Sequence, residues 1–440
     1  MDIRYTLQSE FSGTQYIAGP FNLSGTTSGN TTYLLASGIT KSQLLSGFTV
    51  TTPYNITGGT IQSLGTCSNT PPEAYTLQFI IGNGFNQFVY VNEIQSDNKI
   101  ITGGAFTAFS GVVRNQLARL NSNGSLDTTF IVGSGFGGTT PNTIKIQTDN
   151  KILIGGSFTS YSGVSANKIV RLNTDGSRDN TFNIGLGFGT LFSDSVQTIN
   201  QQSDTKIIVA GNFTTYMGVS ANKIVRLNTD GSRDSTFVVG SGFGTNSNET
   251  VWDSKIQSDG KIIAVGRFTS YNGTSRNSIV RINTNGSIDL TFVVGSGFYH
   301  PTLTEANTIL IQLDGKILVG GNFTSYNGVS TNYMVRLNTN GSLDTTFNPA
   351  VNAAVNEIKS QLDGKLLIIG GTAGGTINLK RLNSDGSLDL TFNISTINGG
   401  LETVNTQSDG KIISSGYFTV YNGVTQNYIT RLNTDGSLNV

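Results

Sequence analysis

One phrase recurs seven times along this 440-residue chain. Anchored on an Arg-Leu-Asn or Arg-Ile-Asn core, it returns at spacings of 52, 55, 55, 55, 45 and 50 residues. Such self-similarity is typical of solenoids and propellers, in which each copy is one supersecondary unit that stacks on its neighbours. The anchors are Arg119, Arg171, Arg226, Arg281, Arg336, Arg381 and Arg431. This repeat restricts the possible folds more than any other feature of the sequence.

Each copy contains four short apolar runs, clearest in residues 254–273 and 278–298. The runs are rich in Ile, Val and Phe, and Asp-Gly, Asn-Gly or Ser-Gly dipeptides bound them, which predicts strands joined by hairpins. No part of the copy has a sustained helical period. Four strands in each of seven units predict an all-β fold, a seven-bladed β-propeller with four-stranded blades.

The two ends of the repeat region are complementary. The last copy stops at residues 437–440, where the others continue into Asp-x-Thr-Phe, and the missing piece precedes the first copy. That piece, residues 79–85, matches residues 130–136. We therefore expect the N-terminal strand to complete the last blade and close the ring, which removes two exposed sheet edges. An open solenoid is the alternative, but it needs capping repeats instead of complementary halves.

The strand order predicts two different faces. The Gln-x-Asp-Gly-Lys and Asn-x-Asp-Gly-Ser hairpins, short and nearly identical, belong to one face. The connections after Gly-x-Gly-Phe belong to the other face, and they vary at residues 137–142, 189–195, 244–251 and 299–307. A repeated scaffold with varied loops is the usual layout of a binding surface.

The Gln-x-Asp-Gly-Lys, Gly-x-Phe-Thr-x-Tyr-x-Gly, Arg-Leu-Asn-x-Asp/Asn-Gly-Ser and Asp-x-Thr-Phe elements resemble the delta-60 repeat family, whose members occur in bacterial surface proteins and phage proteins. The resemblance covers residues 76–440 and implies a β-propeller, but a propeller scaffold supports unrelated activities. The sixth copy departs from the pattern at residues 372–375, Thr-Ala-Gly-Gly. We expect a shortened and poorly filled blade there.

Residues 1–75 have no repeat character and are predicted to form a small β-module, followed by the propeller at residues 76–440. A capping-box spacing at residues 40–43 indicates one short helical turn, and Pro71-Pro72 predicts a stiff spacer. Residues 33–50 resemble sequences of phage structural proteins. We interpret the module as an adaptor to other virion proteins. Its apolar runs are residues 15–22, 32–36, 48–54 and 59–64.

The charge balance restricts the partners and the location. The chain has 27 basic and 27 acidic residues, and only 12% of its residues are charged. Without a basic stripe, nucleic acid is not an expected partner. Residues 1–20 lack the pattern of a secretory signal, no apolar run is long enough for membrane insertion, and Cys67 is the only cysteine. These features favour a virion component, made in the host cytoplasm.

A calcium-binding loop is the most specific metal site that the sequence suggests. Residues 173–179, Asn-Thr-Asp-Gly-Ser-Arg-Asp, resemble acidic calcium loops, but Arg171 stands where such a loop starts with Asp. We expect an ion pair in place of a metal, because the planar fork of Arg suits a carboxylate. In the last copy Arg431 meets Asn439. The expected pairs are Arg119/Asp127, Arg171/Asp179, Arg226/Asp234, Arg281/Asp289, Arg336/Asp344 and Arg381/Asp389.

The sequence offers little for catalysis, so we expect a non-enzymatic protein with no cofactor. His300 is the only histidine, and no Ser-His-Asp or Cys-His set surrounds it. Paired carboxylates of a polysaccharide-degrading enzyme remain an alternative. The unrepeated acids that can serve it are Glu93, Asp194, Glu249, Asp253, Glu305, Glu357 and Glu402.

Four side chains outside the repeat pattern are candidates for ligand contact: Phe192, Trp252, Tyr299 and His300. Exposed aromatic rings offer flat faces for a sugar or a protein. The alternative for Trp252 is packing between blades. The sequence thus leaves three hypotheses: recognition of a host-surface glycan or protein, an architectural disc in a phage tail, fibre or capsid, and an enzyme.

Overall fold

The computed structural model describes residues 14–18, 32–36, 79–189, 191, 193–244, 248–331, 333–371, 378–394 and 396–439. The chain divides into two compact units, Met1–Leu77 and Gln78–Val440. In the first unit β1 (Thr14–Ala18) pairs in parallel with β2 (Thr32–Ala36). The runs predicted at residues 48–54 and 59–64, and the helical turn at residues 40–43, lie outside the described residues.

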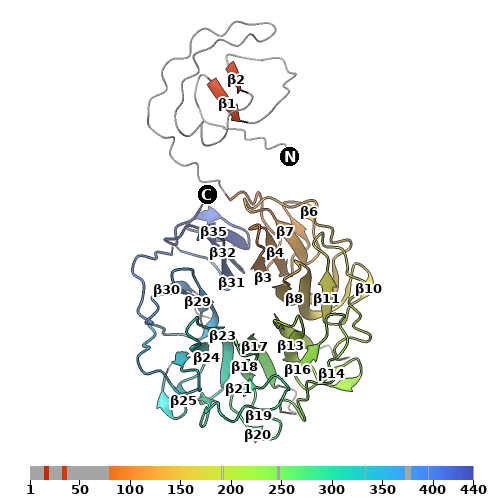
Figure 1. Ribbon diagram of the computed structural model, residues 1–440. Coiled ribbons are helices and arrows are strands. Elements are labelled where there is room, and N and C mark those ends of the chain that lie inside the picture. Colours follow the sequence, from red (N-terminus) through yellow and green to blue (C-terminus); the bar gives the residue numbers. More distant parts are fainter. Residues whose placement is uncertain are drawn as a thin grey trace. The chain divides into compact units, whose positions relative to one another are not determined.

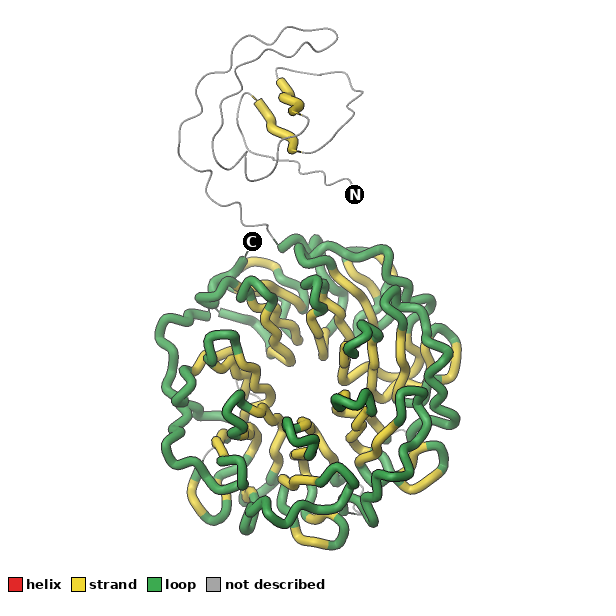
Figure 2. The backbone as a smooth tube through the Cα atoms, viewed as in Figure 1, coloured by secondary structure: helices red, strands yellow, loops and turns green. Residues whose placement is uncertain are grey.

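The second unit is a ring of seven small antiparallel sheets around a common axis (Figures 1 and 2). The first strand of each sheet is innermost, and it lies beside the first strand of the next sheet. The seven-bladed propeller predicted from the repeats is therefore confirmed. The inner strands are β3 (Val89–Ile94), β8 (Phe136–Ile146), β12 (Ser195–Gln201), β17 (Thr250–Ile256), β23 (Glu305–Ile311), β28 (Val355–Ser360) and β31 (Leu401–Thr406).

The middle strand of each blade forms the core. In β18 the side chains of residues 262–265 are all completely buried, because each blade packs between two others and both sheet faces are covered. Such strands are apolar at consecutive positions instead of alternating. The middle strands are β4 (Ile100–Gly104), β9 (Ile152–Tyr161), β13 (Ile207–Asn212), β18 (Ile262–Arg267), β24 (Ile317–Asn322), β29 (Leu366–Gly370) and β32 (Ile412–Gly416).

The third strands carry the Arg-Leu-Asn anchors and complete the regular part of each sheet. They pair antiparallel with the middle strands, for example Ile263↔Arg281. They are β7 (Leu117–Leu120), β11 (Ile169–Leu172), β16 (Ile224–Leu227), β21 (Ile279–Ile282), β27 (Met334–Leu337), β30 (Asn378–Leu382) and β35 (Ile429–Leu432).

The Phe-Thr-x-Tyr-x-Gly element forms a small outer hairpin. Its tyrosine is buried: the Tyr271 hydroxyl donates to Gly286 O at 2.5 Å, and its ring packs on Phe243. The hairpins are β5 (Ala108–Phe109) with β6 (Val112–Val113), β10 (Val164–Ser165) on the end of β9, β14 (Thr215–Tyr216) with β15 (Val219–Ser220), β19 (Ser270–Tyr271) with β20 (Thr274–Ser275), β22 (Phe298–Tyr299) with β25 (Ser325–Tyr326) and β26 (Val329–Ser330), and β33 (Val420–Tyr421) with β34 (Val424–Thr425).

The predicted fourth strand does not form as a regular strand. After the Asn-x-Asp-Gly-Ser turn a single bridge remains, such as Ile282↔Ile288, followed by one hydrogen bond from Asp289 N to Arg281 O. Asp289 Oδ1 then accepts the backbone N–H of Thr291. This Asx turn redirects the chain away from the sheet, which is why the segment leaves the ladder.

The ring closes as predicted, although residues 79–85 form an irregular segment and not a strand. The Phe79 ring lies 4.9 Å from the Arg431 guanidinium, as the Phe130 ring lies 4.5 Å from Arg119. Ile80 N donates to Asn123 O at 2.7 Å. The first residues of the ring therefore supply the piece that the last copy lacks. Residues 372–375, at which a shortened and poorly filled blade was expected, lie outside the described residues.

Candidate functional site

A β-bulge interrupts every inner strand at the same place. In β17 the pairing with β18 shifts between Val251 and Asp253, so Trp252 has no partner in the ladder. Bulges re-aim a side chain and are frequent beside binding sites. The bulged residues are of five types in the seven copies, with asparagine in three of them, and all are at least partly exposed. They are Tyr90, Asn142, Gln197, Trp252, Asn307, Asn356 and Glu402.

The bulge requires a glycine at the first position of the Gly-x-Phe element. The bulged backbone comes so close that a Cβ on Gly266 would lie 2.1 Å from Thr250 O, and one on Gly321 would lie 2.2 Å from Glu305 O. Because no side chain fits there, glycine recurs in each copy at this position. The repeated glycine thus preserves a backbone shape while the bulged side chain varies.

A second varied position adopts a left-handed backbone. The residue before the third strand has a positive φ, 67° at Lys223 and 64° at Tyr333. Non-glycine residues rarely adopt this conformation, and such strain is common at functional sites. The structure maintains it with two backbone hydrogen bonds, Lys223 N to Phe213 O and Gly211 N to Lys223 O. The other described residues at this position are Gln116, Lys168, Ser278 and Tyr428.

The bulge residue and the left-handed residue of each blade lie on the same face of the ring. The bulge is at the start of the inner strand, whereas the Gln-x-Asp-Gly-Lys hairpin is at its end. The residue between Gly and Phe, such as Arg267, and the left-handed residue belong to the same end, because Gly266 N bonds to Ser278 O. We call this end the variable face. Side chains that differ from blade to blade therefore gather on one face of a repeated scaffold.

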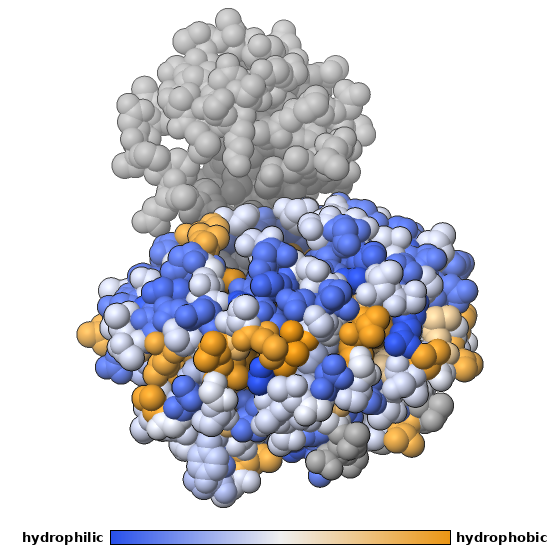
Figure 3. All heavy atoms as spheres, turned by 60° about the horizontal axis from the view of Figure 1, so that its bottom comes forward, coloured by the Kyte–Doolittle hydropathy of each residue, from blue (hydrophilic) through white to orange (hydrophobic). Residues whose placement is uncertain are grey.

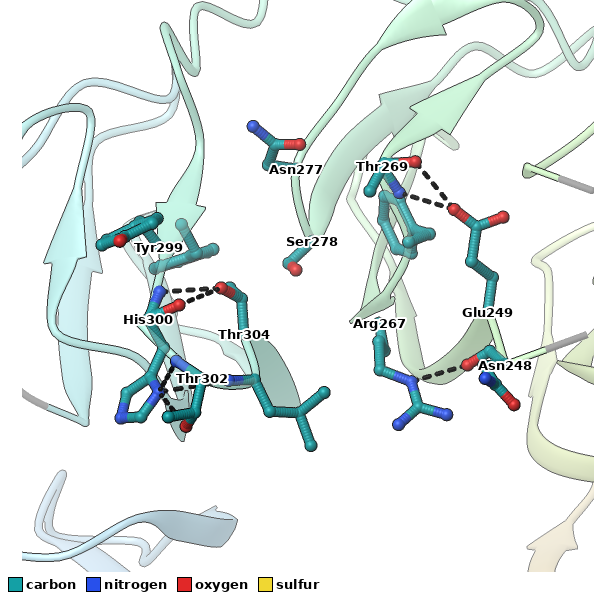
Figure 4. Close-up of a pocket in the computed structure, with 13 residues that line it drawn as sticks. Asn248, Glu249, Arg267, Thr269, Asn277, Ser278, Tyr299, His300, Thr302 and Thr304 are labelled. Carbon is teal, nitrogen blue, oxygen red and sulfur yellow. Dashed lines mark hydrogen bonds between the residues drawn. The ribbon is translucent and has the colours of Figure 1, made fainter. Parts of the chain in front are cut away.

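A cleft of about 500 Å³ lies on the variable face between the fourth and fifth blades. Tyr299 and His300 line one side, and Glu249 and Arg267 line the other (Figure 4). Tyr299 is 59% exposed, so its ring is available to a ligand. The floor includes Ser278, which has the left-handed conformation described above.

The polar groups of the cleft are held in place by local hydrogen bonds. His300 Nδ1 accepts the backbone N–H groups of Thr302 and Leu303 at 3.2 and 3.3 Å. Glu249 Oε1 accepts the N–H and hydroxyl of Thr269. Arg267 Nε donates to Asn248 O at 2.6 Å. A preorganised set of donors and acceptors beside an exposed ring suits a polar ligand.

The structure brings together two of the four predicted ligand-contact residues. Tyr299 and His300 share the cleft, whereas Trp252 is not part of its lining. Trp252 is the half-buried bulge residue of β17, and in the described part of the chain its buried Nε1 has no hydrogen-bond partner. Phe192 lies outside the described residues. Residues 137–142 were predicted to form a varied connection between strands. This prediction is wrong, because β8 extends through these residues and pairs with β9.

Several of the unrepeated acids have structural partners. Asp253 accepts the Ile309 N–H at 3.1 Å and pairs with Lys255 at 2.7 Å. Glu357 accepts the Val404 N–H at 2.7 Å and pairs with Lys359 at 3.4 Å. Each carboxylate thus joins its own inner strand to the inner strand of the next blade. No backbone hydrogen-bond ladder connects these two strands. Among the described residues, no group of three or more His, Cys, Asp or Glu side chains is arranged to hold a metal ion.

The Arg/Asp pairs form as parts of a larger contact. Arg171 Nε donates to Asp179 Oδ2 at 2.7 Å, and Lys151 Nζ reaches the same oxygen at 2.8 Å. Arg171 also donates to Thr229 O of the next blade, and its guanidinium lies 4.7 Å from the Phe182 ring. We call this Arg–Asp–Lys–Phe contact the clasp. The other clasps contain Arg119/Asp127 at 2.8 Å and Arg226/Asp234, Arg281/Asp289, Arg336/Asp344 and Arg381/Asp389 at 2.7 Å.

The clasp already supplies the hairpin carboxylate with two positively charged partners. Burial by itself raises the pKa of Asp179, but hydrogen bonds from Lys151, Thr181 and Arg171 outweigh it and hold the pKa well below its usual range. Two protein cations already occupy this carboxylate. Sequence reasoning missed the lysine, although it recurs in the Gln-x-Asp-Gly-Lys element as Lys99, Lys151, Lys206, Lys261, Lys316 and Lys365.

The seventh clasp lacks its carboxylate, which leads to a prediction. Arg431 Nε donates to Asn439 Oδ1 at 2.8 Å, and Lys411 pairs with Asp409 instead. Asn439→Asp restores the charge and is expected to raise the free energy of unfolding by about 1 kcal/mol. Denaturant unfolding measures it, with Asn422→Asp on an exposed hairpin as the charge-matched control. An Asn439→Asp protein no more stable than the control would contradict the role assigned to the carboxylate.

The comparisons with known proteins agree with this repeat. The family described as "Domain of unknown function (DUF5122) beta-propeller" matches residues 95–130, 147–182, 202–237, 257–292, 312–347, 361–392 and 407–440. The chain belongs to this family. Each matched segment of this DUF5122 propeller starts at the inner hairpin, and the first six end at the phenylalanine of the clasp. No curated protein matches the chain.

Among solved structures, the WD40 propeller domain of Doa1 is similar at 15% identity over 76% of this chain and 91% of that one, with a TM-score of 0.48. Virginiamycin B lyase from Staphylococcus aureus has 17% identity over 68% and 82%, with a TM-score of 0.43. PorZ of Porphyromonas gingivalis has 12% identity over 76% and 45%, with a TM-score of 0.42. At these identities and scores the similarities carry no argument about function. Within the described residues no helix has the length and apolarity of a membrane span.

Proposed function

We propose that this DUF5122 propeller is a non-enzymatic recognition protein whose variable face binds a glycan or protein of a host surface. One observation carries the proposal: every inner strand keeps the same bulge, while the bulged side chain varies among the copies and includes Trp252, Asn307 and Glu402. Purely structural bulges would not require this variety of side chains that reach solvent, five residue types at seven equivalent positions. The cleft beside Tyr299 is the part of this face that best fits a small ligand.

We propose further that the ring is displayed on a virus particle, such as a phage tail, fibre or capsid, through residues 1–75. This part of the proposal is supported by the uncharged polar composition and by the resemblance of residues 33–50 to phage structural proteins. Mass spectrometry of purified particles from the source culture tests it. Absence of the chain from those particles would contradict the location and leave the binding proposal standing.

Binding is tested with the full chain on a glycan array and on host cells. We expect saturable binding that Tyr299→Ala weakens at least tenfold, because an aromatic anchor in a cleft commonly contributes more than 1 kcal/mol. Leu313→Ala, on the opposite face and fully exposed, is the matched control and should bind as the wild type does. Equal binding by both variants would remove the cleft from the proposal. Trp252→Ala tests in the same way whether the bulge residue takes part.

The architectural alternative has an observation of its own. The hairpins β23–β24 and β28–β29, on the face opposite the variable face, carry the exposed leucines Leu313 and Leu362, where other copies have Ser or Thr. Elsewhere on the ring, apolar patches alternate with polar surface along the side that Figure 3 turns forward. If the ring fills a particle as a disc, Leu313→Asp with Leu362→Asp should prevent assembly, whereas Tyr299→Ala should not.

A further inference from the structure

Four aromatic side chains meet on the variable face where the ring closes. The Phe88 ring centroid is 4.7 Å from that of Tyr417 and 5.6 Å from that of Tyr428, and Tyr90 is 5.8 Å from Tyr417. Tyr90 is the bulge residue of the first blade, and Tyr428 is the left-handed residue of the last. Phe88 and Tyr417 are 36% and 39% exposed. All four rings therefore occupy, or adjoin, positions that vary among the blades.

A carboxylate accompanies these rings. Glu402 is the bulge residue of β31, and the Tyr417 hydroxyl hydrogen-bonds to it. Burial raises the pKa of Glu402, the nearby Glu357 raises it further, and the Tyr417 hydrogen bond opposes both effects. In the part of the chain that the structure describes, no lysine or arginine forms an ion pair with Glu402.

Glu402 differs in this respect from other acids of the ring. Asp253 pairs with Lys255, Glu357 with Lys359, and Glu305 with Arg267. A partly buried carboxylate without a basic partner is unfavourable unless something compensates the charge. Here the surroundings add to the negative potential, because the faces of aromatic rings are themselves negative. A positively charged group from outside the chain would satisfy the site.

The kind of cation follows from the rings. Aromatic faces attract cations, and they favour organic ammonium groups that give up their water easily. A small metal ion would need several oxygen ligands in place of its hydration shell, and the site provides one carboxylate and tyrosine hydroxyls. We propose that Glu402 and the rings of Phe88, Tyr90, Tyr417 and Tyr428 bind an organic ammonium group of a ligand. The site is separate from the cleft at Tyr299, so it stands whether or not the cleft binds.

The first test uses the full chain and saturation-transfer NMR of small probes. Tetramethylammonium is the cationic probe, methylammonium a primary one, and tert-butanol a neutral molecule of similar shape. We expect saturable transfer to at least one ammonium probe and at least tenfold weaker binding of tert-butanol. The stronger of the two ammonium probes then assigns a quaternary or a primary amine to the ligand. Equal binding of tert-butanol and both cations would overturn the proposal.

Variants locate the binding. Glu402→Gln keeps the shape and removes the charge, and we expect at least a tenfold loss of affinity for the cationic probe. Tyr417→Leu removes a ring and should weaken binding in the same way, whereas Tyr417→Phe keeps the ring and should bind. Leu313→Ala, fully exposed on the face opposite the variable face, is the control and should bind the cationic probe as the wild type does. A Glu402→Gln protein with an unchanged melting temperature and wild-type affinity would overturn the site.

The pH dependence is a second readout. The titratable groups that face Glu402 are Tyr417 beyond β32, Tyr90 on β3 and Glu357 on β28. Because its pKa is raised, Glu402 takes up a proton at a higher pH than an ordinary glutamate, and the neutral form attracts cations less. Affinity for tetramethylammonium should therefore fall from pH 7 to pH 4. Affinity that is constant over this range would contradict a charged Glu402 as the binding group.

Discussion

The protein is expected to lose stability steeply as the pH falls below about 5. The six clasp aspartates have pKa values held well below the usual range, because hydrogen bonds from threonine, lysine and arginine outweigh the effect of burial. In the unfolded chain an aspartate titrates near pH 3.9. A depressed folded pKa means that the unfolded chain binds protons first, so the stabilisation present above that pH is lost on acidification. The carboxylates are Asp127, Asp179, Asp234, Asp289, Asp344 and Asp389.

Thermal unfolding between pH 7 and pH 2 measures this effect. We expect a nearly constant melting temperature from pH 7 to pH 5 and a fall of on the order of 10 °C or more by pH 3, since six groups act together. Glu402 has a raised pKa and acts in the opposite direction, but it is one group against six. A melting temperature at pH 3 equal to that at pH 6 would show that the clasps contribute little.

The second large expected effect is the loss of stability when a single clasp carboxylate is removed. Asp234→Ala is expected to lower the free energy of unfolding by about 3–5 kcal/mol, because breaking a buried pair leaves its partner uncompensated. Arg226, paired with Asp234 at 2.7 Å, is only 6% exposed and cannot turn into solvent without leaving the Phe237 ring. Lys206, 2.8 Å from the same carboxylate, would lose its partner as well.

The control for this substitution comes from the chain itself. Asp234→Asn reproduces the Arg431/Asn439 arrangement of the last blade, so it should cost less than Asp234→Ala. Asp230→Ala removes an exposed carboxylate of the neighbouring hairpin and should change stability by less than about 1 kcal/mol. Urea unfolding of the three variants ranks them. An Asp234→Ala protein no less stable than Asp230→Ala would refute the clasp as a main contact between blades.

The closure of the ring could be predicted because it depends on complementary ends that are visible in the chain. Residues 79–85 repeat residues 130–136, and the structure places Phe79 against Arg431 as Phe130 lies against Arg119. That the predicted fourth strand does not form could not be foreseen, because its apolar run resembles that of a strand. The Asx turn at Asp289 removes it from the ladder, and that turn depends on where the clasp holds the aspartate.

The candidate site could be predicted only in part. Tyr299 and His300 stand out as unrepeated residues in a varied connection, and they do share a cleft. Glu402 was noticed only as one of seven unrepeated acids, and Tyr90 gave no comparable signal, since it lies inside a run that was predicted to be an ordinary strand. The sign of the bulge was the recurring glycine of Gly-x-Phe, to which no structural role was assigned from the sequence. It is needed because the bulged strand passes about 2 Å from where its Cβ would be.

The sequence by itself determined the number of blades, the closure of the ring and the apolar core, because these depend on period, composition and complementary ends. Tertiary structure decided which side chains meet. Phe88 and Tyr417 are far apart along the chain and become neighbours only when the first blade meets the last. Likewise, a bulge changes the direction of one side chain without changing the pattern of apolar residues around it. The groups available to a ligand therefore depend on backbone approach, which periodicity does not encode.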